Sequence, residues 1–198
     1  DGADNSTTTD TATINNTGIN TTTGANLALA ADLTSTGYEN LVFNTGSGSG
    51  NTEQAMPTIT ITSDAASAPV TLTLKGNNAI DISTQVSTNS TSLTVDGSAL
   101  KAQAAGTTTF EIDSTTIAAT GTLSITGSDG EDIFGDATAG VHASLATTIN
   151  SGAGVDTIFT GTGNDTVNAG SGKDVIDTSS GNDTIDAGAD DDTIDMDG

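Results

Sequence analysis

Residues 151–195 read as five consecutive nonapeptides: SGAGVDTIF, TGTGNDTVN, AGSGKDVID, TSSGNDTID and AGADDDTID. Every sixth position is an aspartate: Asp156, Asp165, Asp174, Asp183 and Asp192. Every eighth position is a β-branched aliphatic residue: Ile158, Val167, Ile176, Ile185 and Ile194. Such a pattern has a physical basis, because glycines allow turns with positive φ, carboxylates converge on a hard cation and aliphatic side chains face a narrow core. The tract predicts short stacked strands with a hard cation at their turns.

The tract resembles the RTX (repeats-in-toxin) calcium-binding β-roll family, whose repeat is G-G-x-G-x-D-x-U-x. A further copy stands at residues 127–135, with Asp132 at the sixth position and Phe134 at the eighth. The departures from the repeat are small. The first position is never glycine within 151–195, Ser179 replaces one glycine at the second position, and Asp190 replaces one at the fourth. The resemblance implies a parallel β-roll that binds several Ca²⁺ ions.

Two nonapeptides form one coil of a β-roll, so aspartates that are two repeats apart are expected to stack. The stacked pairs are Asp156 with Asp174, Asp165 with Asp183, and Asp174 with Asp192. Two carboxylates ~4.8 Å apart repel by about 0.9 kcal/mol in water and about 3.5 kcal/mol at an effective dielectric constant of 20. Ca²⁺ relieves this repulsion, because it accepts six to eight oxygen ligands in flexible geometry, whereas Mg²⁺ requires a near-ideal octahedron.

Resemblance to the family also implies carbonyl ligands from the backbone of the same turns. The three pairs are completed, in order, by the carbonyls of Gly152, Gly154, Ala169 and Ser171; of Gly161, Gly163, Thr178 and Ser180; and of Gly170, Gly172, Ala187 and Ala189. Asp132 is expected to hold another ion with a partner that the spacing does not identify. Asp177, Asp186 and Asp195, at the ninth position, are expected to be solvated charges at the edge of the sheet.

The composition favours cations as partners. The net charge is −23, with three lysines and no arginine, so the surface repels nucleic acid and anionic membranes. An excess of acidic residues often indicates only a solvated surface or a disordered segment. Here, however, the aspartates recur at the same position of every nonapeptide. The chain has no cysteine, and no apolar run approaches the ~20 residues of a membrane span, so no membrane insertion is expected. Asp1–Asp4 reads as the end of another nonapeptide, and both ends of the chain suggest a longer protein.

Short segments with alternating apolar and polar residues precede the nonapeptides. They are 41–43, 59–61, 70–74, 80–82, 93–95, 110–112 and 123–125, and we interpret each as one rung of a solenoid. The expected fold is all-β: a right-handed parallel β-solenoid (irregular β-helix) over 1–126 that continues into a calcium-bound RTX β-roll over 127–198. A β-sandwich is the alternative for 1–126, because the strand spacing fits it too. Residues 136–150 break the nonapeptide phase and are predicted to form a loop; the single histidine, His142, is expected to be an ordinary residue within it.

A second resemblance concerns the function. The segment GYENLVFN, residues 37–44, is similar to rungs that recur in RTX-type bacterial surface-layer (S-layer) proteins, in which Thr/Ser-rich solenoids alternate with nonapeptide tracts. It implies a structural module of a secreted protein that self-assembles into a lattice at the cell surface. The alternative is a module of a secreted RTX adhesin or extracellular fibre.

Catalysis is not expected, and no catalytic or cofactor-binding residue beyond the calcium ligands is predicted. One histidine excludes an H-E-x-x-H zinc site, and neither a G-x-S-x-G turn nor a cysteine nucleophile is present. A phosphate-binding G-x-x-x-x-G-K-[ST] loop is also lacking. Paired carboxylates for glycoside cleavage remain possible from the counts alone, but with no Trp, one Tyr and four Phe the chain offers few platforms for sugars.

Overall fold

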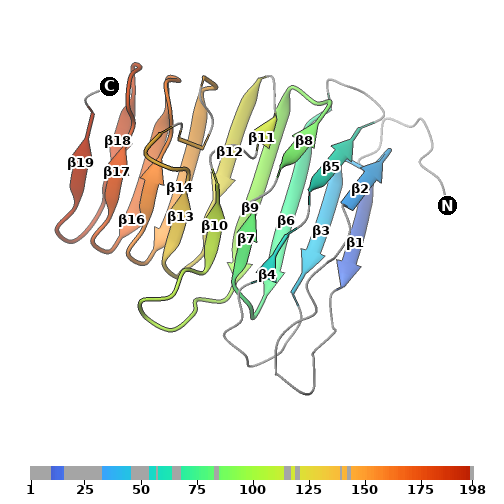
Figure 1. Cartoon of the computed structure of the whole chain (residues 1–198), viewed down its shortest axis with the longest axis horizontal. Helices are drawn as coiled ribbons and strands as arrows, with labels where there is room; N and C mark the ends of the chain where they lie inside the picture. The colour runs from blue at the N-terminus through green and yellow to red at the C-terminus, as the bar shows by residue number, and fades with distance from the viewer. Residues whose placement is uncertain are drawn as a thin grey trace.

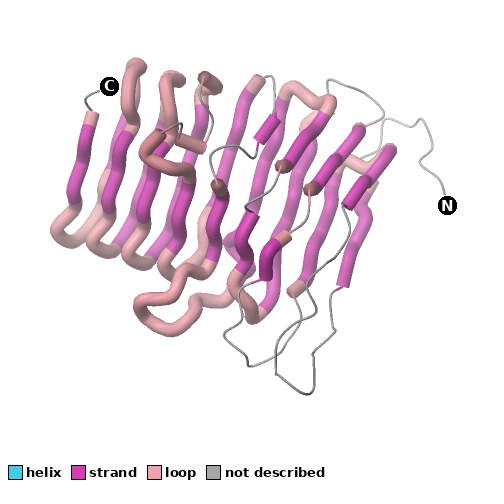
Figure 2. The backbone as a smooth tube through the Cα atoms, viewed as in Figure 1, coloured by secondary structure: helices cyan, strands magenta, loops and turns pink. Residues whose placement is uncertain are grey.

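The structure is a computed structural model of the chain. It describes residues 10–15, 33–45, 54–56, 58–63, 68–82, 85–113, 117–118, 121–138, 140–141 and 144–196. Figure 2 shows that the described segments are strands joined by loops and turns. The nonapeptide remnant at Asp1–Asp4 and the side chain of His142 lie outside these residues. Nothing in the described part of the chain forms a helix long and apolar enough to cross a membrane.

The described residues contain nineteen strands, which form three parallel sheets. The eight-stranded sheet contains, in spatial order, β1 (Thr11–Asn15), β3 (Asn40–Asn44), β6 (Val70–Gly76), β9 (Ser92–Leu100), β12 (Thr122–Thr126), β14 (Thr147–Ala153), β16 (Thr166–Ser171) and β18 (Thr184–Asp186). The seven-stranded sheet contains β4 (Gln54–Ala55), β7 (Ile80–Ile82), β10 (Phe110–Ile112), β13 (Asp132–Phe134), β15 (Thr157–Phe159), β17 (Val175–Asp177) and β19 (Thr193–Asp195). The four-stranded sheet contains β2 (Leu33–Thr36), β5 (Ile59–Thr62), β8 (Val86–Thr88) and β11 (Ile117–Ala118).

The chain winds as a solenoid, with successive coils stacked along the long axis of the molecule (Figure 1). All the pairings between these strands are parallel, as a solenoid requires, so the sandwich alternative for 1–126 is wrong. The interpretation of each strand as one rung is also wrong. One coil enters all three sheets in turn, through β6, β7 and β8, whereas from β12 onward the chain alternates between two sheets only.

The length of a coil follows from the strand register. In the earlier coils Leu72 pairs with Val95, and Leu93 pairs with Leu123, so these coils are unequal in length and both are longer than two nonapeptides. In the nonapeptide tract Ile149 pairs with Val167, which lies two nonapeptides further along the chain. The nonapeptide tract therefore has the shortest and most uniform coils, and loops of varied length account for the irregular spacing before it.

A narrow apolar core runs through the coils. The inward positions alternate with outward ones, as in the buried–intermediate alternation of β3 and β6. Phe110 and Phe134 stack on adjacent coils with an edge-to-face contact, their ring centroids 5.4 Å apart. The eighth-position residues Ile158 and Ile176 are fully buried, and each contributes about 1.5–3 kcal/mol of burial free energy. Ile194 is 46% exposed, because β19 is the edge strand of its sheet.

The sheets continue across the predicted division between residues 126 and 127. β12 pairs with β9 on one side and with β14 on the other, so the division stays a prediction within one continuous solenoid. The predicted loop over 136–150 needs correction at its end. Residues 147–150 belong to β14 and pair with β12 and β16, because Ile149 continues the inward row of the core.

Candidate calcium sites at the turns of the roll

The sixth-position aspartates form two columns at the turns. Column one consists of Asp132, Asp156, Asp174 and Asp192, at or just before the first residues of β13, β15, β17 and β19 in the seven-stranded sheet. Column two consists of Asp165 and Asp183, just before β16 and β18 in the eight-stranded sheet. Because the chain alternates between the two sheets, the columns lie at opposite edges of the roll.

A ladder of hydrogen bonds fixes the register within each column. In column one, the backbone N–H of Asp156 donates to Oδ1 of Asp174 (2.9 Å), and that of Asp174 donates to Oδ1 of Asp192 (3.0 Å). In column two, the N–H of Asp165 donates to Oδ1 of Asp183 at 2.9 Å. The stacking predicted for the three pairs is therefore present in the structure.

The structure also identifies the partner of Asp132, which the spacing left open. The N–H of Asp132 donates to Oδ1 of Asp156 at 2.9 Å, so these two aspartates stack although they are 24 residues apart. The N–H of Phe110 in turn donates to Oδ1 of Asp132 at 3.0 Å. At the corresponding place in column two the N–H of Thr147 donates to Oδ1 of Asp165 at 2.8 Å, so column two begins with a threonine instead of a carboxylate.

Four of the six carboxylates in the columns are buried, and Asp183 and Asp192 at the C-terminal ends are half-buried. Asp132 and Asp156 are 0% exposed, and Asp165 and Asp174 are 1% exposed. The second carboxylate oxygen, Oδ2, has no hydrogen-bond partner in three of them: Asp156, Asp165 and Asp174. A buried anionic oxygen without a donor is costly, and a bound ion is one of the few ways to stabilise it.

Burial raises the pKa of these carboxyl groups. Desolvation is the largest cause, and it raises the pKa of Asp132 from 3.8 to about 7 and that of Asp156 from 3.8 to about 6. Desolvation likewise raises the pKa of Asp165 and Asp174. The neighbouring carboxylate of the column adds to the rise in each case, such as Asp192 for Asp174. The ionised column is thus unstable without a counter-charge.

The chain does not supply this counter-charge from its own side chains. Lys173 is the only basic residue in 151–195, and its Nζ lies 3.3 Å from a carboxylate oxygen of Asp191 at the exposed surface. Among the described residues no three acidic, histidine or cysteine side chains converge on one point. A cation in a column must therefore take most of its oxygen ligands from the backbone.

Backbone carbonyls are stacked beside the carboxylates. A Cβ on Gly172 would overlap the carbonyl oxygen of Gly154, and a Cβ on Gly181 would overlap that of Gly163, so each turn presents its carbonyls to the turn above. The two departures from glycine keep the turn conformation, with φ of 52° at Ser179 and 85° at Asp190. Each costs roughly 1–2 kcal/mol relative to glycine.

Some carbonyls predicted as ligands also accept hydrogen bonds from a neighbouring coil. Ser171 O accepts from Gly154 N (2.9 Å), Gly170 O from Ala189 N (2.9 Å), Ala189 O from Gly172 N (3.2 Å), and Ala169 O from Ser151 Oγ (2.7 Å). A carbonyl oxygen has two lone pairs, so each keeps one for a cation. The other predicted carbonyl ligands lie on the same turns: Gly152, Gly154, Gly161, Gly163, Gly172, Thr178, Ser180 and Ala187. Their role as ligands stays a prediction.

Two hydroxyl groups at the turns were missed by the sequence reasoning. Thr160 and Thr178, at the first position of alternate nonapeptides, are 0% exposed, and neither Oγ1 has a hydrogen-bond partner. The side chain of Thr160 lies close enough to Asp165 to oppose the desolvation that raises the pKa of this carboxyl group. One feature of the sequence could have indicated these hydroxyls. The first position of the nonapeptides alternates between threonine and the smaller residues Ser151, Ala169 and Ala187.

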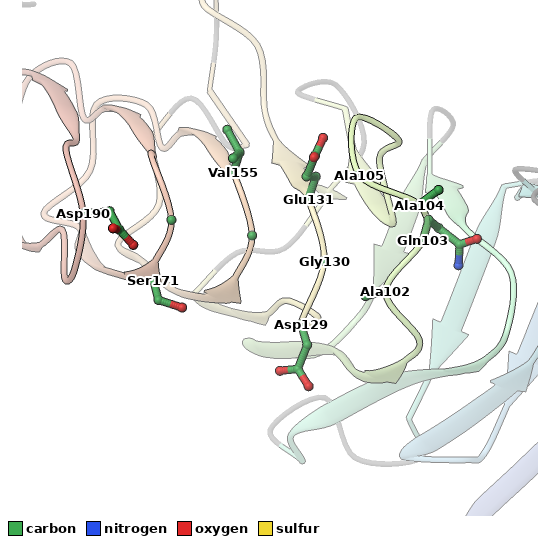
Figure 3. A pocket seen from close by; sticks show the side chains of 12 residues that line it. Ala102, Gln103, Ala104, Ala105, Asp129, Gly130, Glu131, Val155, Ser171 and Asp190 are labelled. Carbon is green, nitrogen blue, oxygen red and sulfur yellow. The ribbon is translucent and has the colours of Figure 1, made fainter.

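An open groove of about 390 Å³ runs along the outer side of column one. Gly130, Gly154 and Gly172, at the fourth position of stacked turns, line it together with alanines of the 102–105 loop. Figure 3 shows that the side chains of Asp129, Glu131 and Asp190 are spread along this groove and do not converge. The groove therefore gives cations an electrostatically negative path to column one, but it contains no separate site with several ligands.

These pKa shifts predict opposite effects of pH on the calcium-free and the calcium-bound protein. Without calcium, Asp132 and Asp156 bind more protons when folded than when unfolded between pH 3.8 and about 7. The free energy of unfolding therefore falls as pH rises through this window, by about 4 kcal/mol for Asp132 alone. We expect the β signal of the calcium-free protein in EDTA to be larger at pH 5 than at pH 8, as measured by circular dichroism.

Calcium binding should show the reverse dependence, because protons compete with the ion for the same carboxylates. In calcium titrations followed by circular dichroism, we expect the affinity to fall between pH 8 and pH 5. A calcium affinity that does not change over this range would contradict carboxylate ligation by the buried columns.

Comparison with known proteins identifies the coiled tract. A family model of the RTX calcium-binding nonapeptide repeat, with four copies, matches residues 146–176 and 168–198. No curated protein and no solved structure matches the chain. The match contains column two and all of column one except Asp132, and it is to a repeat that binds calcium, not to an enzyme family. Residues 146–198 are thus RTX calcium-binding nonapeptide repeats, and the ion that such repeats bind is Ca²⁺.

Proposed function

We propose that the chain is a calcium-dependent structural module of a secreted bacterial S-layer protein, which folds and assembles into a lattice at the cell surface when it binds Ca²⁺. The observation that carries the calcium dependence is the pair of buried aspartate columns. Three of their Oδ2 atoms have no partner, and the only basic residue of 151–195 pairs with Asp191 outside the columns. Calcium thus stabilises the folded roll and has no comparable site on an unfolded chain.

Each ion lies between two stacked turns in this proposal. The carboxylates that share an ion are Asp132 with Asp156, Asp156 with Asp174, Asp174 with Asp192, and Asp165 with Asp183, as the ladder of hydrogen bonds pairs them. For the three pairs within 151–195, the carbonyls assigned above complete the shell: two carboxylates and four carbonyls supply at least six oxygens, within the range that Ca²⁺ prefers. The ion supplies positive charge; the chain positions its ligands and excludes water through its buried turns.

A location outside the cell follows from the same chemistry. RTX repeats are typical of proteins exported by type I secretion. A chain that folds only with calcium stays unfolded in the calcium-poor cytosol and can cross a secretion channel in that state. It then folds in the calcium-rich medium outside the cell. The lack of cysteine agrees with rigidity that comes from ions instead of disulfides.

Charge supports assembly through calcium. Four ions at the stacked pairs neutralise at most eight of the 23 net negative charges and leave −15. Such a surface repels other copies of itself. Exposed carboxylates outside the columns, such as Asp186 and Asp190, could bind further cations between subunits. The likeness of residues 37–44, part of which forms β3, to S-layer rungs favours a lattice over an adhesin.

Electron microscopy of the full-length protein tests this proposal. We expect two-dimensional sheets in millimolar CaCl₂ and no sheets in NaCl of equal ionic strength, because a monovalent ion screens but does not bridge carboxylates. An adhesin or fibre module would give isolated rods or filaments under both conditions. Isolated rods in calcium would overturn the lattice and leave calcium-dependent folding untouched.

A further inference from the structure

The two columns differ at the first position of their turns. The turns of column two carry Thr160 and Thr178, whereas those of column one carry Ser151, Ala169 and Ala187. The Ser151 hydroxyl donates to the carbonyl of Ala169 at 2.7 Å and lies beside Asp156. Among these first-position residues column one thus has one hydroxyl, on its first turn, whereas both turns of column two carry one.

These hydroxyls are buried without full hydrogen-bond partners. Both threonines are 0% exposed, and neither Oγ1 makes a hydrogen bond of normal geometry. The Thr160 hydroxyl lies beside the carboxyl group of Asp165 and lowers its pKa. They stack on adjacent coils, since the N–H of Thr160 donates to Asp177 O and that of Thr178 donates to Asp195 O, the last residue of the following nonapeptide in each case. Buried polar groups are nearly always satisfied, so two buried hydroxyls that lack a full hydrogen-bond partner in one column are suited to bind a cation.

The same turns hold the single carboxylate pair of column two. Thr160 precedes Asp165, and Thr178 precedes Asp183, at the same offset within their nonapeptides. Oδ2 of Asp165 is buried and unpartnered like the hydroxyls. A neutral hydroxyl oxygen has lone pairs that a hard cation accepts, and it adds ligands without adding repulsion between anions. Column one contains three stacked pairs; column two contains one pair with two hydroxyls beside it.

We propose that the Thr160 and Thr178 hydroxyls are additional ligands of the ion between Asp165 and Asp183. The inference rests on the proposed calcium occupancy of both columns. The extra oxygens raise the coordination number above six, which favours Ca²⁺ over the octahedral Mg²⁺. Column one has hydroxyls only beside its first pair, where Ser128 Oγ donates to Asp132 Oδ1 at 2.8 Å and Ser151 lies beside Asp156. Its later turns carry Ala169 and Ala187, which have no hydroxyl.

The test is a calcium titration of ¹⁵N-labelled protein, with NMR of the Asp165 amide for column two and the Asp156 amide for column one. In Thr160→Val/Thr178→Val, which keeps the side-chain shape, we expect the Asp165 midpoint to rise about tenfold and the Asp156 midpoint to stay within about twofold. We expect Thr160→Ser/Thr178→Ser to restore the midpoint, because serine retains the hydroxyl. Magnesium is expected to compete better at Asp165 in the valine variant than in the wild type.

The matched control is Thr166→Val/Thr184→Val, which removes two exposed hydroxyls from the same coils. It should leave both midpoints unchanged. An unchanged Asp165 midpoint in Thr160→Val/Thr178→Val would overturn the inference. So would equal shifts in the valine and serine variants, or a shift of the same size at Asp156, because either result assigns the threonines to packing or to overall stability. If neither amide of the wild type responds to calcium, the proposed function itself fails.

Discussion

Removing calcium is expected to unfold the C-terminal coils. A ligand at 100 times its dissociation constant stabilises the folded state by about 2.7 kcal/mol per site, so four sites contribute about 11 kcal/mol. This equals the whole stability of a typical domain, which is about 5–15 kcal/mol. The apolar core of the roll contributes little stability to replace that of calcium. Its last core-facing residues are poorly covered, because Ile185 is half-buried and Ile194 is 46% exposed.

Far-ultraviolet circular dichroism in EDTA and in millimolar CaCl₂ measures this effect. We expect the β signal to rise strongly with calcium, and hydrogen exchange to show that the gain lies in 127–195. The earlier coils should keep part of their signal in EDTA, since their core of Leu, Ile, Val and Phe contains no aspartate column. NaCl at equal ionic strength is the control for screening. Identical spectra in EDTA and in calcium would contradict calcium-dependent folding.

Asp174→Asn is expected to remove more calcium than any substitution at the ninth position. Asp174 belongs to two stacked pairs, since it accepts the N–H of Asp156 and donates its own N–H to Asp192. Asparagine keeps a hydrogen-bond acceptor at Oδ1 but removes the charge from two sites at once. In isothermal titration calorimetry we expect the stoichiometry to fall by about two ions, or the affinity of these two sites to fall at least tenfold.

The matched control is Asp186→Asn, at an exposed ninth position. It removes the same charge from the same region, so any loss due to net charge alone will be equal in both variants. Asp177 is a poorer control, because its Oδ1 accepts the backbone N–H of Ser179 at 2.9 Å and so supports that turn. Equal calorimetric losses for Asp174→Asn and Asp186→Asn would show that the column register is wrong.

The repeats alone determined the organisation of the roll. The resemblance to the RTX β-roll implies two nonapeptides per coil, and a strict period then places residues two repeats apart at the same point of successive coils. The stacking of Asp156 with Asp174 and of Asp165 with Asp183 followed from these two facts together. The alternation of apolar and polar residues placed strands at 41–43, 70–74, 93–95 and elsewhere, and the structure has strands there. Local periodicity suffices wherever all coils have the same length, because register is then a property of the sequence itself.

Only the tertiary structure decided what happens where the coils are unequal. The stacking of Asp132 on Asp156 departs from the two-repeat spacing, and it is fixed by the parallel pairing of β13 with β15. The three-sheet section of the earlier coils also depends on pairing between strands whose separation along the chain differs from coil to coil. The burial of the Thr160 and Thr178 hydroxyls could not be inferred either, since a threonine in a turn is usually exposed. In each case the packing between coils decided which residues stack and which are buried. A repeat along the chain cannot specify which atoms the next coil will cover.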